Sequence, residues 1–234
     1  MRLPFFYEEE LPVDDTFMLS ENSSHHIMQA LRMKQGENIL VTNGNGQTLQ
    51  AKIIHGNKKK TTVRVVERNY TAKAFPEISI AIGLIKNKNR LEWFIEKASE
   101  MGIAAIFPTI TSRTEKQSFN LERIKSISVS AMLQSQQSWL TEIHEPVKFG
   151  ALIKDARQKK KFIAHCSDGE KKPLSKQFLD HDSLILIGPE GDFTSEEIAD
   201  AIKNNFIPVS LGETRLRTET AGIVAAVLCK LSCQ

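Results

Sequence analysis

Cysteine is scarce in this sequence of 234 residues, and its three cysteines (Cys166, Cys229 and Cys233) cannot all pair with one another. An odd and sparse set of this kind indicates reduced thiols and disfavours the disulfide framework of a secreted domain. Cys229 and Cys233 have helical spacing, but a lone pair is a weak metal signal. We therefore expect neither disulfides nor a metal site.

Long hydrophobic runs are also missing. No run reaches the length that spans a bilayer, and the first six residues lack the layout of a signal peptide. We therefore expect a cytoplasmic protein without a membrane segment. Hydrophobic residues make up 41% of the chain and charged residues 25%, which is ordinary for a globular protein. The length suits one large domain or two small ones.

Two common phosphate-binding motifs do not occur. The sequence has neither Gly-x-x-x-x-Gly-Lys-Ser/Thr nor a Gly-x-Gly-x-x-Gly that opens a predicted helix. Gly44 and Gly46 lie in a predicted hairpin turn, and no helix follows them. These absences disfavour P-loop NTPases, ordinary dinucleotide enzymes and the commonest glycine-rich methyltransferases. His25 and His26 are consecutive, so they do not share a helix face and joint metal binding is disfavoured.

Positive charge is concentrated in the middle third of the chain. The net charge of +3 divides into +1 for residues 1–72, +6 for 73–161 and −4 for 162–234. This asymmetry fits a nucleic-acid partner, and a solvated lysine-rich surface is the alternative. For Lys58–Lys60 and Lys159–Lys161 taken alone, the solvated surface is the favoured interpretation.

The first seventy residues are predicted to form a small β-barrel. Residues 39–42 and 48–54 read as strands around Asn43-Gly44-Asn45-Gly46, and Asn-Gly supplies the positive φ angles of a tight hairpin. A third strand is predicted over residues 61–66, and a short capped helix over 23–32. Composition changes near Tyr70–Pro76, so we place a domain boundary there, with domains at 1–72 and 73–234.

Beyond the boundary, predicted strands and helices alternate, which is typical of an α/β domain with a mainly parallel sheet. Strands are expected at 78–85, 103–108, 162–165, 184–187 and near 209, with helices at 90–101, 121–136 and after the last two strands. Leu91, Phe94, Ile95 and Ala98 have helical apolar spacing, and Gly102 is expected to stop that helix.

Two glycine-punctuated segments near the C-terminus each predict a buried strand, a tight polar loop and a helix start. The first loop contains Gly188-Pro189-Glu190-Gly191, and Thr194 with Glu197 forms a capping box after it. Its glycines would permit unusual backbone angles and close ligand approach. If the two strands are adjacent and parallel, their loops build a ligand crevice at one sheet edge. A tight connection without a ligand is the alternative.

The second loop carries Arg215 and Arg217 between its strand and its helix. Two arginines beside exposed backbone amides suit an anionic or carbonyl-rich substrate. The alternative is a surface ion pair with Glu213 or Glu219.

Together, Ile187-Gly188-Pro189-Glu190-Gly191 and the run from Leu211 to Ala221 closely resemble the RsmE family. Its members are 16S ribosomal RNA uridine-N3 methyltransferases of the small subunit, within the SPOUT superfamily. The resemblance covers nearly the whole chain. Upstream residues resemble the family's N-terminal PUA-like barrel and the first strand and helix of its catalytic domain: His25-His26, Leu31-Arg32, Gly36, residues 43–46, Lys86, Arg90, Lys97, Glu100, Gly102 and Pro108.

The resemblance implies S-adenosylmethionine as the cofactor, a SPOUT-type sheet with a C-terminal trefoil knot, and a homodimer whose second subunit completes the site. It places these residues around the cofactor: His165, Ile187, Gly188, Pro189, Gly191, Leu211, Gly212, Leu216 and Thr220. It makes these residues candidates for RNA contacts: His26, Arg32, Lys86, Arg90 and Arg113. The implied partner is 16S ribosomal RNA or the small ribosomal subunit.

For the chemistry, Arg217 is the candidate that stabilises negative charge on the uracil oxygens as the N3 proton leaves. Glu219 is the nearest candidate base, or a helix residue that orients Arg217. One segment departs from the family pattern. The family's Glu-Gln-Ser/Cys-Gly-Arg run is replaced by Leu133-Gln134-Ser135-Gln136-Gln137, so its acidic residue and its arginine are absent.

Two other functions are compatible with these residues. One is a SPOUT enzyme that modifies a different RNA position with the same cofactor pocket. The other is a ribosome assembly factor that binds RNA and has lost turnover.

Overall fold

A computed structural model describes residues 3–115 and 118–232 of the chain. The chain divides into two compact units. The first comprises the segment that ends at Lys73 together with Met132–Leu140, and the second comprises Ala74–Ala131 and the segment from Thr141 onward.

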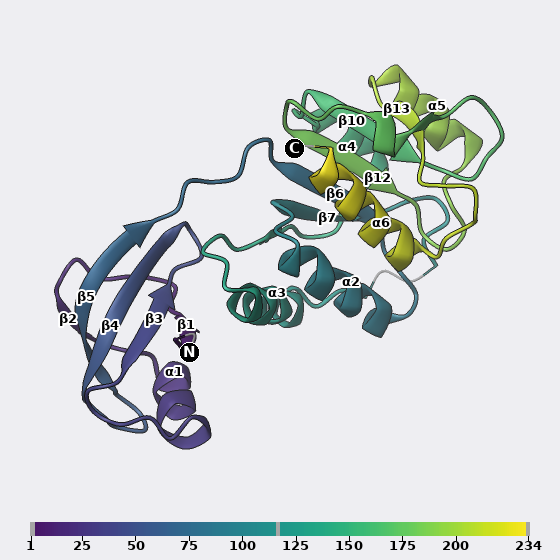
Figure 1. The fold of residues 1–234 in the computed structure, drawn as a ribbon. Coiled ribbons are helices and arrows are strands. Elements are labelled where there is room, and N and C mark those ends of the chain that lie inside the picture. Colours follow the sequence, from purple (N-terminus) through teal and green to yellow (C-terminus); the bar gives the residue numbers. More distant parts are fainter. Residues whose placement is uncertain (1–2, 116–117, 233–234) are drawn as a thin grey trace. The chain divides into compact units, whose positions relative to one another are not determined.

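The first unit is built on one curled sheet in the order β1-β3-β4-β5-β2 (Figure 1). Its strands are β1 (Phe5–Tyr7), β2 (Thr16–Met18), β3 (Asn38–Thr42), β4 (Gln47–His55) and β5 (Thr62–Tyr70). All neighbours run antiparallel except β1 and β3, which run parallel. Within the described residues no ladder joins β1 to β2, so the small barrel is an incompletely closed one. Apolar side chains from the sheet and from Ile27 fill its core.

The predicted hairpin and helix of this unit are both present, with one shifted boundary. β3 and β4 pair around the turn in which Gly44 has φ 71° and Gly46 has φ 84°. The helix begins earlier than predicted: α1 (Glu21–His25) is capped by the Ser20 hydroxyl, which accepts the Ser23 N–H at 3.3 Å. It continues as a π-helix, η1 (His26–Ala30), and the chain then turns at Arg32, where φ is 52°.

Met132–Leu140, which begins with the last residues of α3 (Leu121–Ser135), packs on the hairpin turn of the first unit. The Trp139 indole N–H donates to the Thr71 carbonyl at 2.8 Å. A Cβ on Gly46 would come within 2.7 Å of both the Thr71 carbonyl oxygen and Cζ2 of Trp139. Gly46 is therefore fixed by its positive φ and by this close approach.

The second unit contains a parallel sheet of eight strands, in the order β11-β13-β10-β12-β6-β7-β8, with β9 also paired to β7 (Figure 1). The strands are β6 (Ile78–Gly83), β7 (Ala105–Ile110), β8 (Glu142–Ile143), β9 (Val147–Lys148), β10 (Lys160–Ala164), β11 (Lys172–Pro173), β12 (Ser183–Ile187) and β13 (Ile207–Ser210). Every pair in this sheet is parallel. The predicted α/β class is confirmed.

Helices cover both faces of this sheet because its central strands are apolar on both sides. The helices are α2 (Lys88–Glu100), α3 (Leu121–Ser135), α4 (Phe149–Asp155), α5 (Ser195–Lys203) and α6 (Thr218–Leu231), with a short 3-10 turn η2 (Leu174–Lys176). On β6, Ile80 and Ile82 pack in the cluster with α2 and α6, whereas Ala81 packs in the cluster with α4 and α5. Such two-sided burial explains the near-continuous apolar runs of these strands.

Several local predictions for this unit are confirmed. Gly102 ends α2 with φ 69°, and both hydrogen bonds of the Thr194–Glu197 capping box are present at the start of α5.

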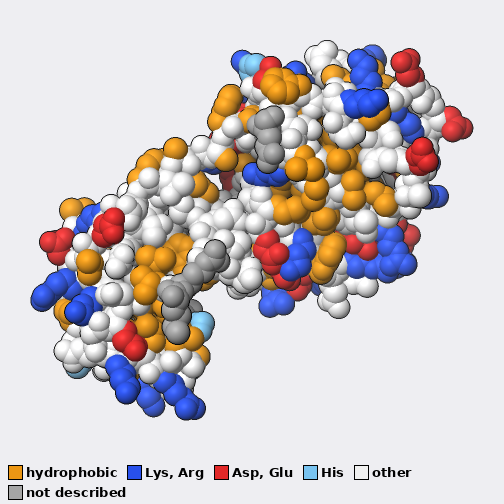
Figure 2. Space-filling view, in the orientation of Figure 1, with side chains coloured by type: hydrophobic (Ala, Val, Ile, Leu, Met, Phe, Trp, Pro, Cys, Tyr) orange, Lys and Arg blue, Asp and Glu red, His pale blue; other side chains and the backbone are white. Residues whose placement is uncertain are grey.

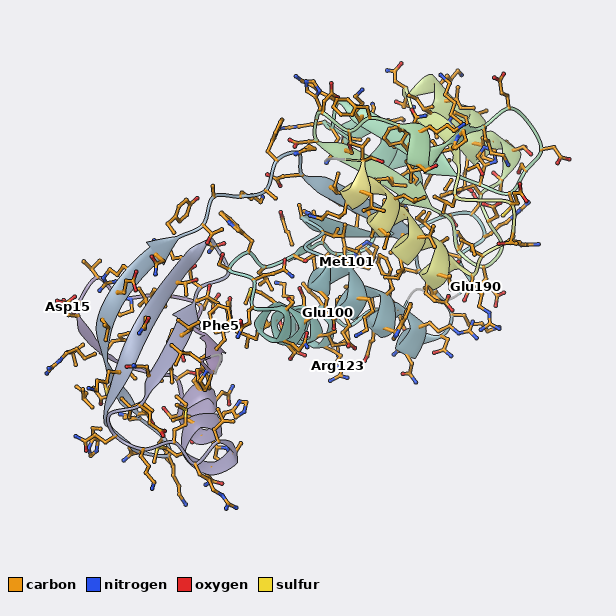
Figure 3. The ribbon with its side chains drawn as sticks, in the orientation of Figure 1. Phe5, Asp15, Glu100, Met101, Arg123 and Glu190 are labelled. Atoms are coloured by element: carbon orange, nitrogen blue, oxygen red, sulfur yellow. The ribbon has the colours of Figure 1, made fainter. Side chains whose placement is uncertain are left out.

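Arg123 on α3 donates to Glu92 on α2 at 3.0 Å on the exposed side of this helix pair (Figure 3). In the part of the chain that the structure describes, no helix is long and apolar enough to cross a membrane.

The last helix returns across the sheet. β13 lies beyond β10, on the far side from β6, yet α6 packs against β6 and α2. Gly222 of α6 permits this contact, because a Cβ there would come within 2.5 Å of the Phe94 ring. The segment between β13 and α6 therefore spans the width of several strands, and it carries the second predicted loop.

Candidate functional site

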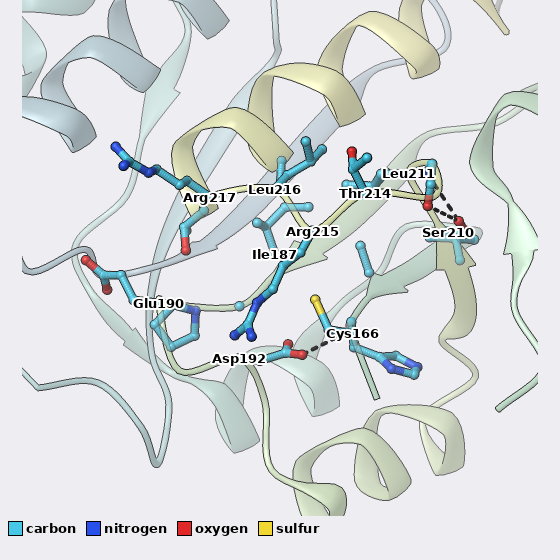
Figure 4. A pocket seen from close by; sticks show the side chains of 18 of the residues that line it. Cys166, Ile187, Glu190, Asp192, Ser210, Leu211, Thr214, Arg215, Leu216 and Arg217 are labelled. Carbon is cyan, nitrogen blue, oxygen red and sulfur yellow. Dashed lines mark hydrogen bonds between the residues drawn. The ribbon is translucent and has the colours of Figure 1, made fainter. Parts of the chain in front are cut away.

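A pocket of about 640 Å³ opens at the carboxyl edge of the parallel sheet (Figure 4). Loops that follow β10, β12 and β13 surround it, and Arg90 on α2 contributes from the side. Main-chain groups line it together with the apolar side chains of Ile187, Leu211 and Leu216. A pocket of this volume can hold a cofactor-sized molecule.

The two predicted loops meet at this pocket, but their strands are not adjacent. β10 lies between β12 and β13 and pairs in parallel with both. The condition that the two strands are adjacent is therefore not met, because the order of strands in a sheet depends on long-range crossovers that local sequence does not encode. Because β10 lies between the two strands, His165 and Cys166 at its end form a third wall of the pocket.

Asp192 ties the loop after β12 to the loop after β10. Its Oδ2 accepts the Cys166 N–H at 2.7 Å, and its Oδ1 accepts the Phe193 N–H at 2.8 Å. The residue with left-handed backbone in this loop is Asp192, with φ 62°, and neither Gly188 nor Gly191 has positive φ. Gly188 is instead needed for space, since a Cβ there would come within 3.0 Å of the Asp192 carboxylate.

A glycine outside the predicted motifs also shapes this loop. Gly83 ends β6, and a Cβ at that position would come within 2.6 Å of the Pro189 ring and 2.9 Å of its Cα. Contacts this short with backbone atoms force the loop to move. The position of Pro189, and with it the pocket wall, therefore depends on the absence of a side chain at Gly83.

The loop after β13 turns at Gly212, where φ is 141°. Ser210 stabilises the turn, because its hydroxyl donates to the Gly212 carbonyl at 3.0 Å and lies 3.2 Å from the Gly212 N–H, which donates to it. A Cβ on Gly212 would meet no atom within 4 Å. Glycine is thus required here by the backbone angle, and the space beside it is open to a ligand.

Arg215 and Arg217 are exposed, and within the described residues neither forms a hydrogen bond or an ion pair through its side chain. The alternative of ion pairs with Glu213 or Glu219 therefore does not hold in this structure. Arg215 points into the pocket between Ile187 and Asp192 (Figure 4). Arg217 also lines the pocket, occupies the N-cap position of α6 without a side-chain cap hydrogen bond, and directs its side chain away from Arg215 (Figure 4).

Glu219 is buried at the first turn of α6 and pairs with Arg90. Its Oε1 lies 3.5 Å from the Arg90 Nε, and 9% of its side chain is exposed. Its Oε2 is buried and has no hydrogen-bond partner among the described residues. Glu219 does not line the pocket, whereas Arg90 does.

His165 lies at the end of β10 with both ring nitrogens buried and, in the described chain, without hydrogen-bond partners. Burial lowers the pKa of His165 below its usual range, and the ammonium of Lys171 lowers it further. Lys171 is held close by its own hydrogen bonds to the carbonyls of His165, at 3.1 Å, and Ser167, at 2.8 Å. His165 is therefore a neutral ring with free polar atoms at a pocket wall.

The structure brings together most of the predicted cofactor residues but not all of them. Those that line the pocket are His165, Ile187, Gly188, Pro189, Leu211, Gly212 and Leu216. Gly191 and Thr220 lie outside the lining. The Gly191 carbonyl accepts a hydrogen bond from the Arg113 guanidinium at 2.6 Å, so this glycine supports the loop from behind.

Of the predicted RNA contacts, Arg90 lines the pocket and two others have protein partners. Lys86 pairs with Glu115 at 2.7 Å, and Arg113 holds Gly191. His26 and Arg32 belong to the first unit, where both are exposed. The His26 ring meets Phe6 edge-on, with ring centres 5.8 Å apart.

Sequence reasoning missed several pocket residues, among them Cys166, Lys171, Glu190 and Asp192. Asp192 follows the Gly188–Gly191 motif directly and could have been suspected as the residue that closes its turn. Cys166 and Lys171 follow β10 in a segment without a distinctive motif. Cys233, half of the weak metal pair, lies outside the described residues. Within the described ranges no cluster of three or more potential metal ligands occurs.

Two family models match the chain. An RNA methyltransferase domain matches residues 73–230, and an RNA methyltransferase PUA domain matches residues 19–66.

Similar proteins have consistent names. A relative from Synechocystis sp., named ribosomal RNA small subunit methyltransferase E, is 30% identical over 91% of this chain and 72% of its own length. A structure described as a probable rRNA methyltransferase from Porphyromonas gingivalis aligns over 98% of both chains, with TM-score 0.92 and 33% identity. A ribosomal RNA small subunit methyltransferase E from Neisseria gonorrhoeae, bound to S-adenosylmethionine, aligns over 98% of both chains, with TM-score 0.89 and 25% identity.

Proposed function

This chain belongs to the ribosomal RNA small subunit methyltransferase E family of S-adenosylmethionine-dependent RNA methyltransferases, and we propose that it methylates N3 of a specific uridine in 16S ribosomal RNA. The observation that carries the proposal is the pocket bounded by the loops after β10, β12 and β13, with Arg217 at its rim. The middle of the chain is basic, which suits an RNA substrate.

The pocket suits S-adenosylmethionine. Its volume of about 640 Å³ exceeds what one small side chain or a few waters would fill. Ile187, Leu211 and Leu216 offer apolar surface, while the free nitrogens of His165 and the open space at Gly212 offer polar contacts. Gly188 and Pro189 complete this wall, and Gly191 supports it from outside the lining through its hydrogen bond from Arg113. The cofactor supplies a methyl group on a sulfonium, which is already electrophilic.

The enzyme's task is then to align the base and to stabilise charge. Holding N3 in line with the methyl group makes the reaction effectively unimolecular, which lowers the barrier by roughly 7–11 kcal/mol at the extreme. We assign Arg217 the role of stabilising negative charge on the uracil oxygens as the N3 proton passes to solvent water, which reaches this exposed side of the pocket. Its guanidinium has no ion-pair partner among the described residues, so it is available to the substrate.

Glu219 fits the role of a positioning residue better than that of a base. It is buried, it does not line the pocket, and its Oε1 pairs with Arg90. We assign it the role of holding Arg90 at the pocket wall, where Arg90 can contact the substrate. A base would have to reach the N3 proton directly or through one water.

The remaining parts of the proposal concern assembly. The return of α6 from β13 to β6 supports a trefoil knot at the C-terminal end of the sheet. Exposed apolar residues on α6 and nearby, namely Val227, Leu231 and Phe178, support a homodimer through this face, and apolar side chains gather over it in Figure 2. The partner would be 16S ribosomal RNA or the small ribosomal subunit, met in the cytoplasm.

Mass mapping of ribosomal RNA tests the proposed function. The purified protein, with S-adenosylmethionine, should add one methyl group to N3 of a single uridine, on 16S RNA or on small subunits from a strain that lacks the enzyme. A methyl group at another position would identify a different SPOUT reaction. Binding of S-adenosylmethionine in calorimetry without transfer to either substrate would identify a non-catalytic assembly factor.

A further inference from the structure

The first unit has a strongly basic end that no motif of the cofactor site explains. Its β4–β5 turn presents Lys58, Lys59 and Lys60 in succession, all exposed. Taken as a sequence, this run fits an ordinary solvated surface. In the fold, however, this run lies on a rigid turn beside further basic residues, which favours a binding surface.

The turn is rigidly built. The Asn57 side-chain oxygen accepts the N–H groups of Lys59, at 2.9 Å, and Lys60, at 3.2 Å. The Thr61 hydroxyl donates to the Asn57 carbonyl at 2.7 Å. Because these bonds satisfy the backbone within the turn, the three lysine side chains are left to project into solvent. A flexible loop would lose more conformational entropy on binding.

The turn is also fixed to the helical segment α1–η1. The Thr61 N–H donates to the Ser24 hydroxyl at 2.9 Å. A Cβ on Gly56 would come within 2.9 Å of the Met28 side chain, so the turn and η1 are in close contact. The segment that follows η1 runs beside the end of β4, where the Gly36 N–H donates to the Ile53 carbonyl at 2.8 Å.

These contacts gather cations from two parts of the sequence. The α1–η1 segment and the bend after it contribute Arg32 and Lys34, and β4 with its turn contributes Lys52 and Lys58–Lys60. Two carboxylates, Glu21 and Glu37, lie in the same stretches, residues 20–37 and 52–61, and Glu8 reaches the Ser20 hydroxyl at 2.9 Å. Figure 2 shows basic side chains gathered at this end of the unit. We call the turn Lys58–Lys60 and Arg32 together the basic end.

We propose that the basic end binds the phosphate backbone of the RNA substrate, with Lys58–Lys60 as its principal contacts. The inference rests on the proposed function, and it adds Lys58–Lys60 to Arg32, the one residue of the basic end that the family resemblance implies as an RNA contact. Compact ammonium groups on flexible stems suit phosphates as point charges without reading base sequence. The lysines therefore position the RNA and do not select the target uridine.

Salt-dependent binding to a 16S RNA transcript tests the proposal. A triple substitution of Lys58, Lys59 and Lys60 by Ala should reduce the slope of log affinity against log salt by about 2 to 3, since each phosphate contact contributes roughly 0.7–0.9. At fixed salt the KM for RNA should rise about tenfold or more while kcat stays within about twofold, because base positioning at the pocket is untouched.

Matched variants separate charge from structure. Replacing the same three lysines by Arg keeps the charge and should restore the slope and KM. Replacing Lys172, Lys176 and Lys203, three exposed lysines in the acidic last third of the chain, by Ala removes equal charge and should change the slope by less than one contact. An unchanged slope in the first variant, or an equal loss in the control, would overturn the proposal.

The readouts also separate this proposal from the proposed function. RNA affinity requires no turnover, so the wild-type slope and its loss can be measured even with a protein that transfers no methyl group. Binding of S-adenosylmethionine in calorimetry should be identical in all variants, which shows that the second unit is folded. Wild-type methylation with an unaffected lysine variant would contradict only the basic end.

Discussion

The pocket is proposed to bind the cofactor and the basic end the RNA phosphates, and the two sites depend on different features of the sequence. The pocket depends on backbone geometry: Gly83, Gly188 and Gly212 are each fixed by a close approach or a positive φ. The basic end depends on the number of cations held on a rigid turn. A pocket shaped by backbone contacts can lose its ligand when one methyl group is added. A surface that binds through charge instead loses a similar amount of binding free energy for each cation that is removed. Local motifs therefore reveal the first kind of site far better than the second.

Arg217 gives the largest expected effect, because we propose that it stabilises the charge that develops on the uracil ring. Arg217→Ala should lower the methyl-transfer rate about 10²–10³-fold, as removal of one donor to a developing oxyanion does. Single-turnover transfer to 16S RNA measures it, with S-adenosylmethionine affinity as the check on folding. Arg157→Ala, an exposed arginine remote from the pocket lining, serves as the control. Near-normal turnover in Arg217→Ala would remove the residue from the chemistry.

Gly83→Ala tests the geometric character of the pocket by adding one methyl group. The new Cβ would come within 2.6 Å of the Pro189 ring, so the wall must shift. Overpacking of this kind costs about 1–3 kcal/mol, and a matching loss of cofactor affinity would be roughly 5- to 150-fold. Calorimetry with S-adenosylmethionine measures the affinity, and denaturant unfolding measures the stability.

Gly150→Ala is the matched control for that substitution. Gly150 lies in α4, and a Cβ there would meet no atom within 4 Å. Alanine in a helix should stabilise the protein by about 0.5–1 kcal/mol and leave cofactor affinity unchanged. If Gly83→Ala bound the cofactor as well as Gly150→Ala does, the wall at Pro189 would not be part of the site.

Substitutions of Glu219 and Arg90 test whether their ion pair positions Arg90 at the pocket wall. Glu219→Gln should lower kcat/KM only about fivefold, near 1 kcal/mol, because Arg90 is partly exposed and the pair is screened. Arg90→Gln should cost a similar amount, and the double variant should cost little more than either single one. The shape of the pH–rate profile should not change. A loss above about a hundredfold in Glu219→Gln, with one limb of the profile removed, would make Glu219 the base.

Features of the fold that rest on local physics were predictable from sequence. Gly102 ends its helix with positive φ, the Thr194–Glu197 capping box is complete, and Gly44 and Gly46 form the hairpin turn. Each depends on a few neighbouring residues. The two loops of the pocket were found for the same reason, since their glycines and turn residues lie in short segments.

Features that depend on distant partners were not predictable. The place of β10 between β12 and β13 depends on crossovers between distant segments. The sequence therefore predicted only His165 at the end of β10 as a pocket residue, and Cys166 and Lys171 were missed. The first helix begins after Ser20 and not at Ser23, and Ser20 is held by Glu8, whose carboxylate accepts the Ser20 N–H at 3.1 Å and its hydroxyl at 2.9 Å. The neighbourhood of Lys58–Lys60 and η1 arises from contacts between segments about thirty residues apart, which no local pattern shows.

The smallest expected effect concerns the segment in which this chain departs from its family. Gln136 follows α3 with φ 57°, at the position where the family has glycine. A left-handed residue other than glycine costs roughly 1–2 kcal/mol, so Gln136→Gly should raise the free energy of unfolding by up to about 1 kcal/mol after the added chain entropy of glycine. The Gln137 N–H, which donates to the Met132 carbonyl at 3.0 Å, would keep the same turn. Denaturant unfolding measures the gain, while cofactor and RNA affinities should both stay unchanged. A destabilised variant would mean that the Gln136 side chain contributes more than its backbone strain removes, and the departure from the family would then be stabilising in its own right.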